Sequence, residues 1–159
     1  MNISEENLKA AMRHWTTGVS VVCSSYKNEY SGMTVNSFAS VSLDPPLVII
    51  TMNNETMTKQ SVDRSGKFSV SILSNEQQFI AERFAGKLHE NRNKFTDIKI
   101  ELLPGGTPAI SDSLAILECD VFNTIPLTNS TIIIGKVIFI SYKKNGAPLV
   151  YHNREYASI

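Results

Sequence analysis

The sequence predicts a mainly β fold with α-helices: a β-barrel with short flanking helices. Several stretches of alternating or continuous apolar residues, rich in β-branched and aromatic side chains, have the length of strands. Two or three other segments carry apolar residues at helical spacing. Because these elements share one chain of 159 residues without a linker, repeat or low-complexity segment, we expect a single domain over residues 1–159.

The N-terminal segment is expected to form an amphipathic helix over residues 4–15. Ser4 can cap its start, two glutamates follow in the first turn, and apolar residues recur at helical spacing up to Trp15. A threonine pair and Gly18 end this helix. Residues 19–24 then have the apolar, β-branched character of a strand.

A hairpin is expected next. Residues 26–30 are polar and turn-like, so the strand at 19–24 is predicted to pair with a strand at 33–41. The alternation of that second strand is interrupted near Asn36 and Ser37.

The chain then passes a double proline into an apolar run. Pro45 and Pro46 break the preceding strand, and residues 47–52 are apolar enough for a strand buried on both faces. A short helix is expected over 56–64, because Gly66 lies just beyond its end.

A strand at 68–73 and a second short helix are predicted to follow. Ser74 can begin the helix, with Gln77 three residues later as its capping-box partner, and Gly86 ends it. The next segment, 87–97, reads as a charged loop.

The C-terminal third is expected to be β-structure. A weak strand at 98–102 precedes two long alternating strands, 115–125 and 132–142, which are joined across residues 126–130. A short strand at 148–151 is expected to be the last.

Composition excludes several classes of function. Charged residues make up 19% of the chain and the formal net charge is zero, which argues against nucleic acid or an anionic membrane as the main partner. Cys23 and Cys119 lie in apolar runs and are expected to be buried free thiols in a reducing cytoplasm. The histidines show no metal-ligand spacing, and the longest apolar run is interrupted by Gly135 and Lys136, so no metal site or membrane span is expected.

The remaining candidate site consists of hydroxyl and amide side chains. The sequence contains no Walker A motif, no GxGxxG fingerprint and no GxSxG elbow. Alternating hydroxyls from Thr34 to Ser42 fit either a solvent-facing strand or a site for a flat ligand with polar edges. Thr56 and Thr58 stand at the start of a predicted helix, where free N–H groups favour a phosphate, and Lys59 could assist.

Seven short motifs resemble, in the same order along the chain, those of the flavin reductase-like family, which has the FMN-binding split-barrel fold. The resemblance covers nearly the whole sequence, and its most specific parts are the runs GMTVNSF and SLDPPLV. The motifs are residues 15–19, 32–38, 40–48, 65–68, 83–86, 134–137 and 148–151.

The resemblance implies a function and a set of partners. It implies a homodimer that binds flavin near the subunit interface and reduces FMN or FAD with NADH or NADPH. The reduced flavin would pass to a separate monooxygenase. The alternative is an FMN-binding electron-transfer protein that another protein reduces, and a third is a flavin-binding protein without redox turnover.

The resemblance also implies site residues. The flavin ring and ribityl chain would contact Met33, Thr34, Val35, Asn36, Ser37, Ala39 and Ser40. The phosphate would be held by Thr56 and Thr58 with Lys59, and Phe84, Ala85 and Gly86 would close over the flavin or its tail. No catalytic acid or base is expected, because the flavin carries the redox chemistry.

One segment departs from the family pattern. Many members carry Gly-Asp-His before the strand that matches 132–142, and the histidine is linked there to nicotinamide binding. Here residues 127–131 read Leu-Thr-Asn-Ser-Thr, which favours the electron-transfer alternative. His152 follows the last predicted strand and is the candidate for binding the nicotinamide substrate, although a lone C-terminal histidine can also be incidental.

Overall fold

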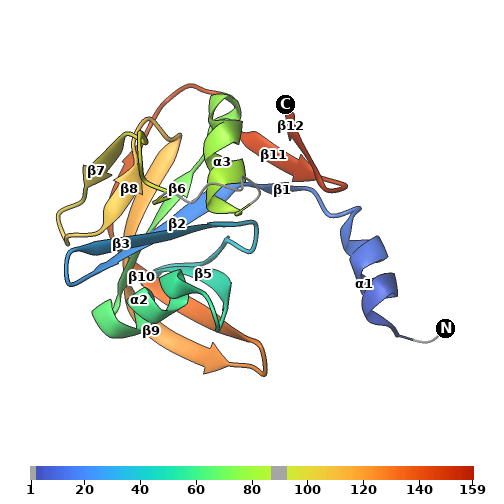
Figure 1. Ribbon diagram of the computed structural model, residues 1–159, viewed down its shortest axis with the longest axis horizontal. Coiled ribbons are helices and arrows are strands. Elements are labelled where there is room, and N and C mark those ends of the chain that lie inside the picture. Colours follow the sequence, from blue (N-terminus) through green and yellow to red (C-terminus); the bar gives the residue numbers. More distant parts are fainter. Residues whose placement is uncertain (1–2, 87–92) are drawn as a thin grey trace.

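A seven-stranded antiparallel sheet dominates the computed structural model, which describes residues 3–86 and 93–159 (Figure 1). Its strand order is β3–β2–β6–β9–β10–β5–β4, and the two end strands, β3 and β4, do not pair with each other in the described structure. The sheet therefore curves without closing, as a split barrel. Its strands are β2 (Ser20–Tyr26), β3 (Glu29–Val35), β4 (Ala39–Leu43), β5 (Pro46–Asn53), β6 (Lys67–Ile72), β9 (Ala115–Pro126) and β10 (Ser130–Tyr142).

Two smaller sheets and three α-helices complete the described structure. The helices are α1 (Glu5–Met12), α2 (Met57–Ser65) and α3 (Gln78–Phe84), the last preceded by a 3₁₀ turn at Asn75–Gln77. The small sheets join β1 (Thr17–Gly18), β11 (Leu149–His152) and β12 (Glu155–Ser158), and separately β7 (Ile100–Leu102) and β8 (Pro108–Ile110). The mainly β fold with short helices is confirmed.

Helices α2 and α3 cover opposite faces of β2. Val22 belongs to a core cluster that includes Val62 of α2, whereas Val21 packs with Ala81 and Phe84 of α3. Because side chains alternate along a strand, β2 is buried on both faces and links the two clusters. Helix α1 differs, since none of its residues is buried and it projects from the body as an arm (Figure 1).

Local signals placed three helix ends correctly, but α1 ends at Met12 rather than before the threonine pair and Gly18. The Ser4 hydroxyl accepts a hydrogen bond from the Asn7 amide at 3.2 Å, which caps α1. Gly66 ends α2 with φ 69°, a left-handed conformation that favours glycine. The Ser74 amide donates to Gln77 Oε1 at 3.0 Å, as the capping box requires.

Two expectations about the first half of the chain are wrong. The strand predicted at 33–41 splits, because β3 ends at Val35 and β4 pairs with β5 rather than with β2. Strand β5 is not buried on both faces in the described chain: Val48, Ile50 and Met52 are buried, while the residues between them are half-buried.

The predicted elements also omitted three short strands: β1, which pairs with the distant β11, and β8 and β12, which form hairpins with the preceding strands β7 and β11. The strand at 148–151 is consequently not the last. Residues 87–92 of the predicted charged loop lie outside the described residues. None of the helices in residues 3–86 and 93–159 has the length and apolar character needed to span a bilayer.

Candidate functional site

Two hydroxyls fix the end of β3 and the crossing to β4. The Thr34 hydroxyl donates to the Ala81 carbonyl at 2.7 Å, which joins β3 to α3. The Ser37 hydroxyl donates to the Thr51 carbonyl at 3.1 Å and accepts from the Thr51 amide at 3.0 Å. The Ser37 side chain thus bonds the backbone of Thr51 at the point where the chain leaves β3. The exposed Asn36 lies between Thr34 and Ser37, whose side chains are both hydrogen-bonded.

A hollow of about 190 Å³ opens beside this segment, and we call it the first hollow. Its wall combines small apolar side chains, two polar ones and two aromatic rings, a mixture that suits a flat ligand with polar edges. The lining residues are Val19, Thr34, Val35, Asn36, Ala85, Tyr151 and Tyr156.

The aromatic wall comes from the C-terminal hairpin. Tyr151 of β11 lies opposite Tyr156 of β12, and their ring centroids are 5.3 Å apart with an interplanar angle of 57°. Burial, followed by the neighbouring Tyr151 and Glu82, raises the pKa of the Tyr156 phenol. Tyr156 therefore keeps its proton well above neutral pH and can donate a hydrogen bond.

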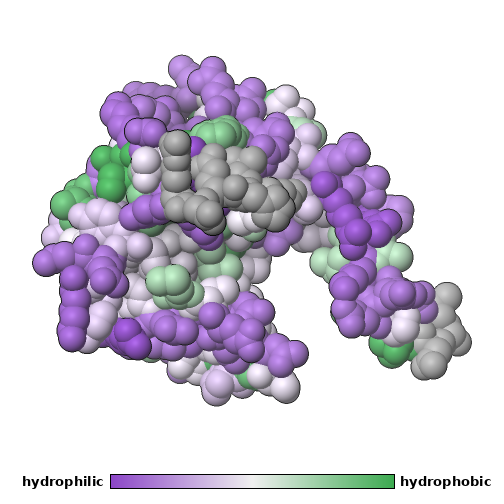
Figure 2. Space-filling view, in the orientation of Figure 1, coloured by the Kyte–Doolittle hydropathy of each residue, from purple (hydrophilic) through white to green (hydrophobic). Residues whose placement is uncertain are grey.

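A second hollow, of about 450 Å³, lies between α1 and the turn of the same hairpin. It shares Asn36 and Tyr151 with the first hollow, so the two are continuous. Figure 2 shows the recess that separates the α1 arm from the body of the molecule. Its other lining residues are Lys9, Met12, Arg13, Trp15, Thr17, Ser37, Asn153 and Arg154.

Five of the predicted site residues meet at these hollows. Thr34, Val35, Asn36 and Ala85 line the first, and Ser37 lines the second beside Asn36. Four of these residues are consecutive, and only Ala85 lies far from them in sequence. The hydrogen bond from Thr34 to Ala81 of α3 brings Ala85 close to the other four.

Other predicted residues lie nearby without lining either hollow. Met33 packs against the main core cluster. The ring of Phe84 is buried against Gly32 and lies 5.0 Å from the Phe95 ring, so it does not close over a surface ligand in this structure. Gly86 ends the α3 segment with φ 73°.

On the other side of the site, Ala39 and Ser40 are exposed on β4, opposite Ile49 and Val48 of β5.

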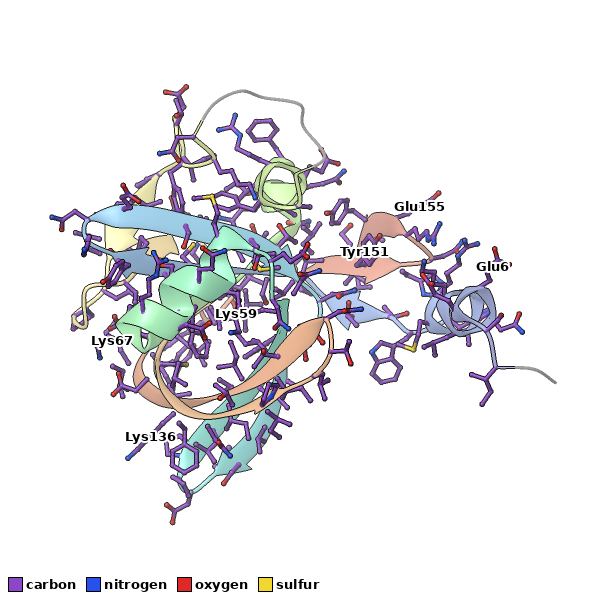
Figure 3. All side chains as sticks on the ribbon, turned by 60° about the horizontal axis from the view of Figure 1, so that its bottom comes forward. Glu6, Lys59, Lys67, Lys136, Tyr151 and Glu155 are labelled. Atoms are coloured by element: carbon purple, nitrogen blue, oxygen red, sulfur yellow. The ribbon has the colours of Figure 1, made fainter. Side chains whose placement is uncertain are left out.

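The proposed phosphate residues form a separate group at the start of α2. The Thr56 hydroxyl donates to the Asn53 carbonyl at 2.9 Å and accepts from the Lys59 amide at 3.3 Å, so it caps the helix. Thr58 is only 3% exposed. The Lys59 ammonium lies 2.6 Å from a carboxylate oxygen of Asp63. Figure 3 shows Lys59 on α2, whereas Tyr151 lies on β11, nearer to α1.

His152 does not join the predicted site. Its Nδ1 lies 2.7 Å from the Thr16 hydroxyl, and its exposed ring lines neither hollow. Tyr151 lines both hollows instead. Neighbouring residues of a strand point to opposite faces, and this alternation explains the difference.

Sequence reasoning missed Tyr151 and Tyr156 as site residues. The available signal is Asn153, a residue type that tolerates positive φ in turns; in the structure Asn153 and Arg154 have φ of 48° and 67° and form a two-residue hairpin turn. A hairpin predicted around Asn153 would have placed the two tyrosines opposite each other.

Comparison with known proteins gives one family for nearly the whole chain. Residues 12–159 match the model described as "Flavin reductase like domain". The chain is 30% identical over 155 residues to a flavin reductase of Pseudomonas putida, covering 97% of this chain and 89% of that protein. It is 32% identical over 152 residues to the reductase component of a 4-hydroxyphenylacetate 3-monooxygenase of Thermus thermophilus, covering 96% and 95%.

Solved structures give the same result. The flavin reductase PheA2 in its native state superposes with a TM-score of 0.91 at 31% identity, covering 99% of both chains. An NADH:FAD oxidoreductase of Streptomyces globisporus, solved with NAD and FAD fragments, superposes with a TM-score of 0.88 at 28% identity, covering 99% of this chain and 96% of that one.

Proposed function

Because this chain belongs to the flavin reductase-like family, we propose that it is a flavin-binding oxidoreductase that reduces FMN or FAD with NADH or NADPH. The observation that carries the proposal is the family match over residues 12–159, together with a hollow lined by the family's own motif residues. Relatives of this chain are named NADH-dependent flavin reductase and FMN reductase (NADH).

The mixed polar and apolar lining of the first hollow suits the edge and face of a flavin ring. Asn36 forms no hydrogen bond with a described residue, so its amide can offer both a donor and an acceptor to the ring edge. Thr34 uses its proton on the Ala81 carbonyl, which leaves its oxygen to accept. A bound flavin supplies the redox chemistry here, and donors fixed at the ring edge stabilise the negative charge that hydride uptake creates.

Further residues would extend this proposed flavin-binding site. Ala85 and Gly86 would border the flavin from the α3 end, and Met33, Val35, Ser37, Ala39 and Ser40 from the strands. The start of α2 is the proposed phosphate-binding site, because the free N–H groups and the positive end of the helix dipole favour an anion there. The buried Thr58 would contribute its backbone N–H, while Thr56 and Lys59 shape the helix start.

A homodimer is the proposed assembly. Helix α1 buries none of its residues in the single chain, and Trp15 beyond it is 67% exposed. Large apolar side chains are also exposed on β4, β9 and β10, and a second copy would cover them. These are Val41, Leu43, Phe122, Ile125, Ile138 and Ile140. Sedimentation should give a mass near twice 17.6 kDa, and a monomer at micromolar concentration would contradict the assembly.

A flavin-dependent monooxygenase is the proposed recipient of the reduced flavin. Relatives include the reductase component of a 4-hydroxyphenylacetate 3-monooxygenase, and the solved structures include the flavin reductase of the styrene monooxygenase from Pseudomonas putida S12. We also propose a cytoplasmic location, because the buried thiols Cys23 and Cys119 are unpaired and suit a reducing compartment.

Steady-state kinetics test the proposed activity. Purified protein is mixed with NADH or NADPH and with FMN or FAD, and nucleotide oxidation is followed by absorbance. Turnover above the background of free flavin is expected with at least one pair. No turnover with any pair, from protein that binds flavin, would contradict the reductase function.

The electron-transfer alternative is favoured by one structural feature. Residues 127–130 form a tight turn between β9 and β10, closed by a bond from the Leu127 amide to the Ser130 carbonyl at 2.8 Å, and no histidine stands there. Tightly bound FMN that resists both nucleotides but accepts electrons from a reduced protein would support this alternative.

A further inference from the structure

The second hollow carries an excess of positive charge. Lys9, Arg13 and Arg154 line it, and no carboxylate is among its lining residues. Lys9 pairs with Glu5, but neither guanidinium forms a salt bridge with any residue in the described part of the chain. Two unpaired guanidinium groups beside one recess form a favourable environment for a phosphate-type anion.

A backbone contact between the two ends of the chain brings together the segments that carry Arg13 and Arg154. The Asn153 amide donates to the Arg13 carbonyl at 3.0 Å, which ties the end of α1 to the turn of the C-terminal hairpin. Arg154 follows in that turn with φ 67°. This bond places the backbone of Arg13 beside the turn that carries Arg154, although the two arginines lie near opposite ends of the chain, so the recess is part of the folded structure.

The recess also contains an unused polar group. Thr17 lines it, and the Thr17 hydroxyl is buried without a hydrogen-bond partner among the described residues. A buried hydroxyl without a partner is uncommon in folded proteins. The Thr17 oxygen is itself buried, so it belongs to the wall of the recess rather than to the surface that a ligand would contact.

The two hollows together match the shape of a dinucleotide. The first has aromatic and apolar walls that suit a flat ring, and the second has cations that suit phosphates. They meet at Asn36 and Tyr151, so one ligand can reach both. A mononucleotide phosphate seated at α2 would leave the cations of the second hollow unoccupied.

We propose that Arg13 and Arg154, with Lys9 in support, bind the pyrophosphate of a dinucleotide that extends from the first hollow, either FAD with its flavin ring in that hollow or the hydride donor with its nicotinamide ring against the flavin. This inference rests on the proposed function, and the dinucleotide is the hydride donor or FAD. The N-terminal helix therefore takes part in substrate recognition, although it buries none of its own residues.

Substrate pairs with and without a pyrophosphate test the site. The variants are Arg13→Gln, Arg154→Gln and their double variant. The control is Arg64→Gln, which removes the same charge from an exposed arginine that lines neither hollow. The donors are NADH and reduced nicotinamide riboside, which has no phosphate, and the acceptors are FMN and FAD.

Each single variant is expected to raise the KM for NADH or the Kd for FAD roughly tenfold, the effect of one charge-assisted hydrogen bond. Kinetics with reduced nicotinamide riboside and FMN should stay within about twofold of the wild-type protein. A change confined to NADH identifies the donor as the ligand, and a change confined to FAD identifies the flavin. The proposal is overturned if neither constant changes, or if the kinetics of the pair without a pyrophosphate, reduced nicotinamide riboside and FMN, are weakened equally.

Direct binding separates this inference from the proposed function. Calorimetric titration with ADP-ribose, which carries the pyrophosphate but no reactive ring, needs no turnover. Binding by the wild-type protein that is lost in the double variant supports the anion site even if no nucleotide is oxidised. Equal binding by both proteins overturns it, and sedimentation checks that the variants keep the wild-type mass.

Discussion

The hydroxyl oxygen of Ser37 lies 3.1 Å from the carbonyl oxygen of Thr51 and 3.0 Å from its amide nitrogen. One side chain therefore satisfies both backbone groups of a residue in β5. This pairing holds the crossing from β3 to β4, which carries Asn36 between the two hollows.

Replacing Ser37 with alanine should loosen this crossing. Losing two hydrogen bonds at an exposed position is expected to lower the free energy of unfolding by about 1–2 kcal/mol and to weaken flavin binding. Urea denaturation and fluorescence titration with FMN measure the two effects. Ser158→Ala, at the exposed end of β12, is the control. An unfolding midpoint equal to that of the control would contradict the role of Ser37.

Gly32→Ala should strain the contact between β3 and α3. A Cβ at this position would lie 2.6 Å from Cε1 of Phe84 and 3.2 Å from Sγ of Cys23, inside a filled core. Overpacking of this kind costs about 1–3 kcal/mol, measurable by urea denaturation. Gly18→Ala is the control, because a Cβ there meets nothing within 4 Å. Equal stability of the two variants would show that Phe84 moves aside freely.

Thr56→Ala separates helix capping from phosphate binding. Loss of the cap should cost about 1 kcal/mol of stability, and Thr56→Ser should restore it because the hydroxyl caps equally well. If the start of α2 also holds the flavin phosphate, the alanine variant should weaken FMN binding more than riboflavin binding. Fluorescence titrations with both ligands provide the measurement, and equal weakening of both would place the phosphate elsewhere.

The buried thiols predict a loss of stability at alkaline pH. Burial raises the pKa of both Cys23 and Cys119 to about 12, from an ordinary value of 9.0. Between these values the unfolded chain releases thiol protons that the folded chain retains, so stability falls as the pH rises from about 9 towards 12. The slope is about 1.4 kcal/mol per pH unit for each thiol.

Urea midpoints between pH 8 and 11 measure this fall. The Cys23→Ala variant should show a shallower slope than the wild-type protein, whereas other alkaline titrations affect both proteins alike. Identical slopes would contradict the assignment. In the folded protein at pH 8, neither thiol should react with a disulfide reagent.

Local chemistry made some features of this protein readable from the sequence. Ser4, Thr56 and Gly66 marked helix ends because capping depends on neighbouring residues alone. The motif at residues 32–38 helped to identify the family and contains Thr34, Val35 and Asn36 of the first hollow. The motif at residues 83–86 contains a fourth lining residue, Ala85.

Tertiary structure decided the rest, because it depends on contacts between distant residues. The bonds from Ser37 to Thr51 hold the crossing where the chain leaves β3, so β4 pairs with β5 rather than with β2. Tyr151 rather than His152 lines the hollows, since hairpin register determines which side chain faces inward. The sequence by itself determined the family and indicated the segment that we propose binds flavin. Only folding brought Arg13 to Asn153 and so created the cationic recess, because that contact joins the two ends of the chain.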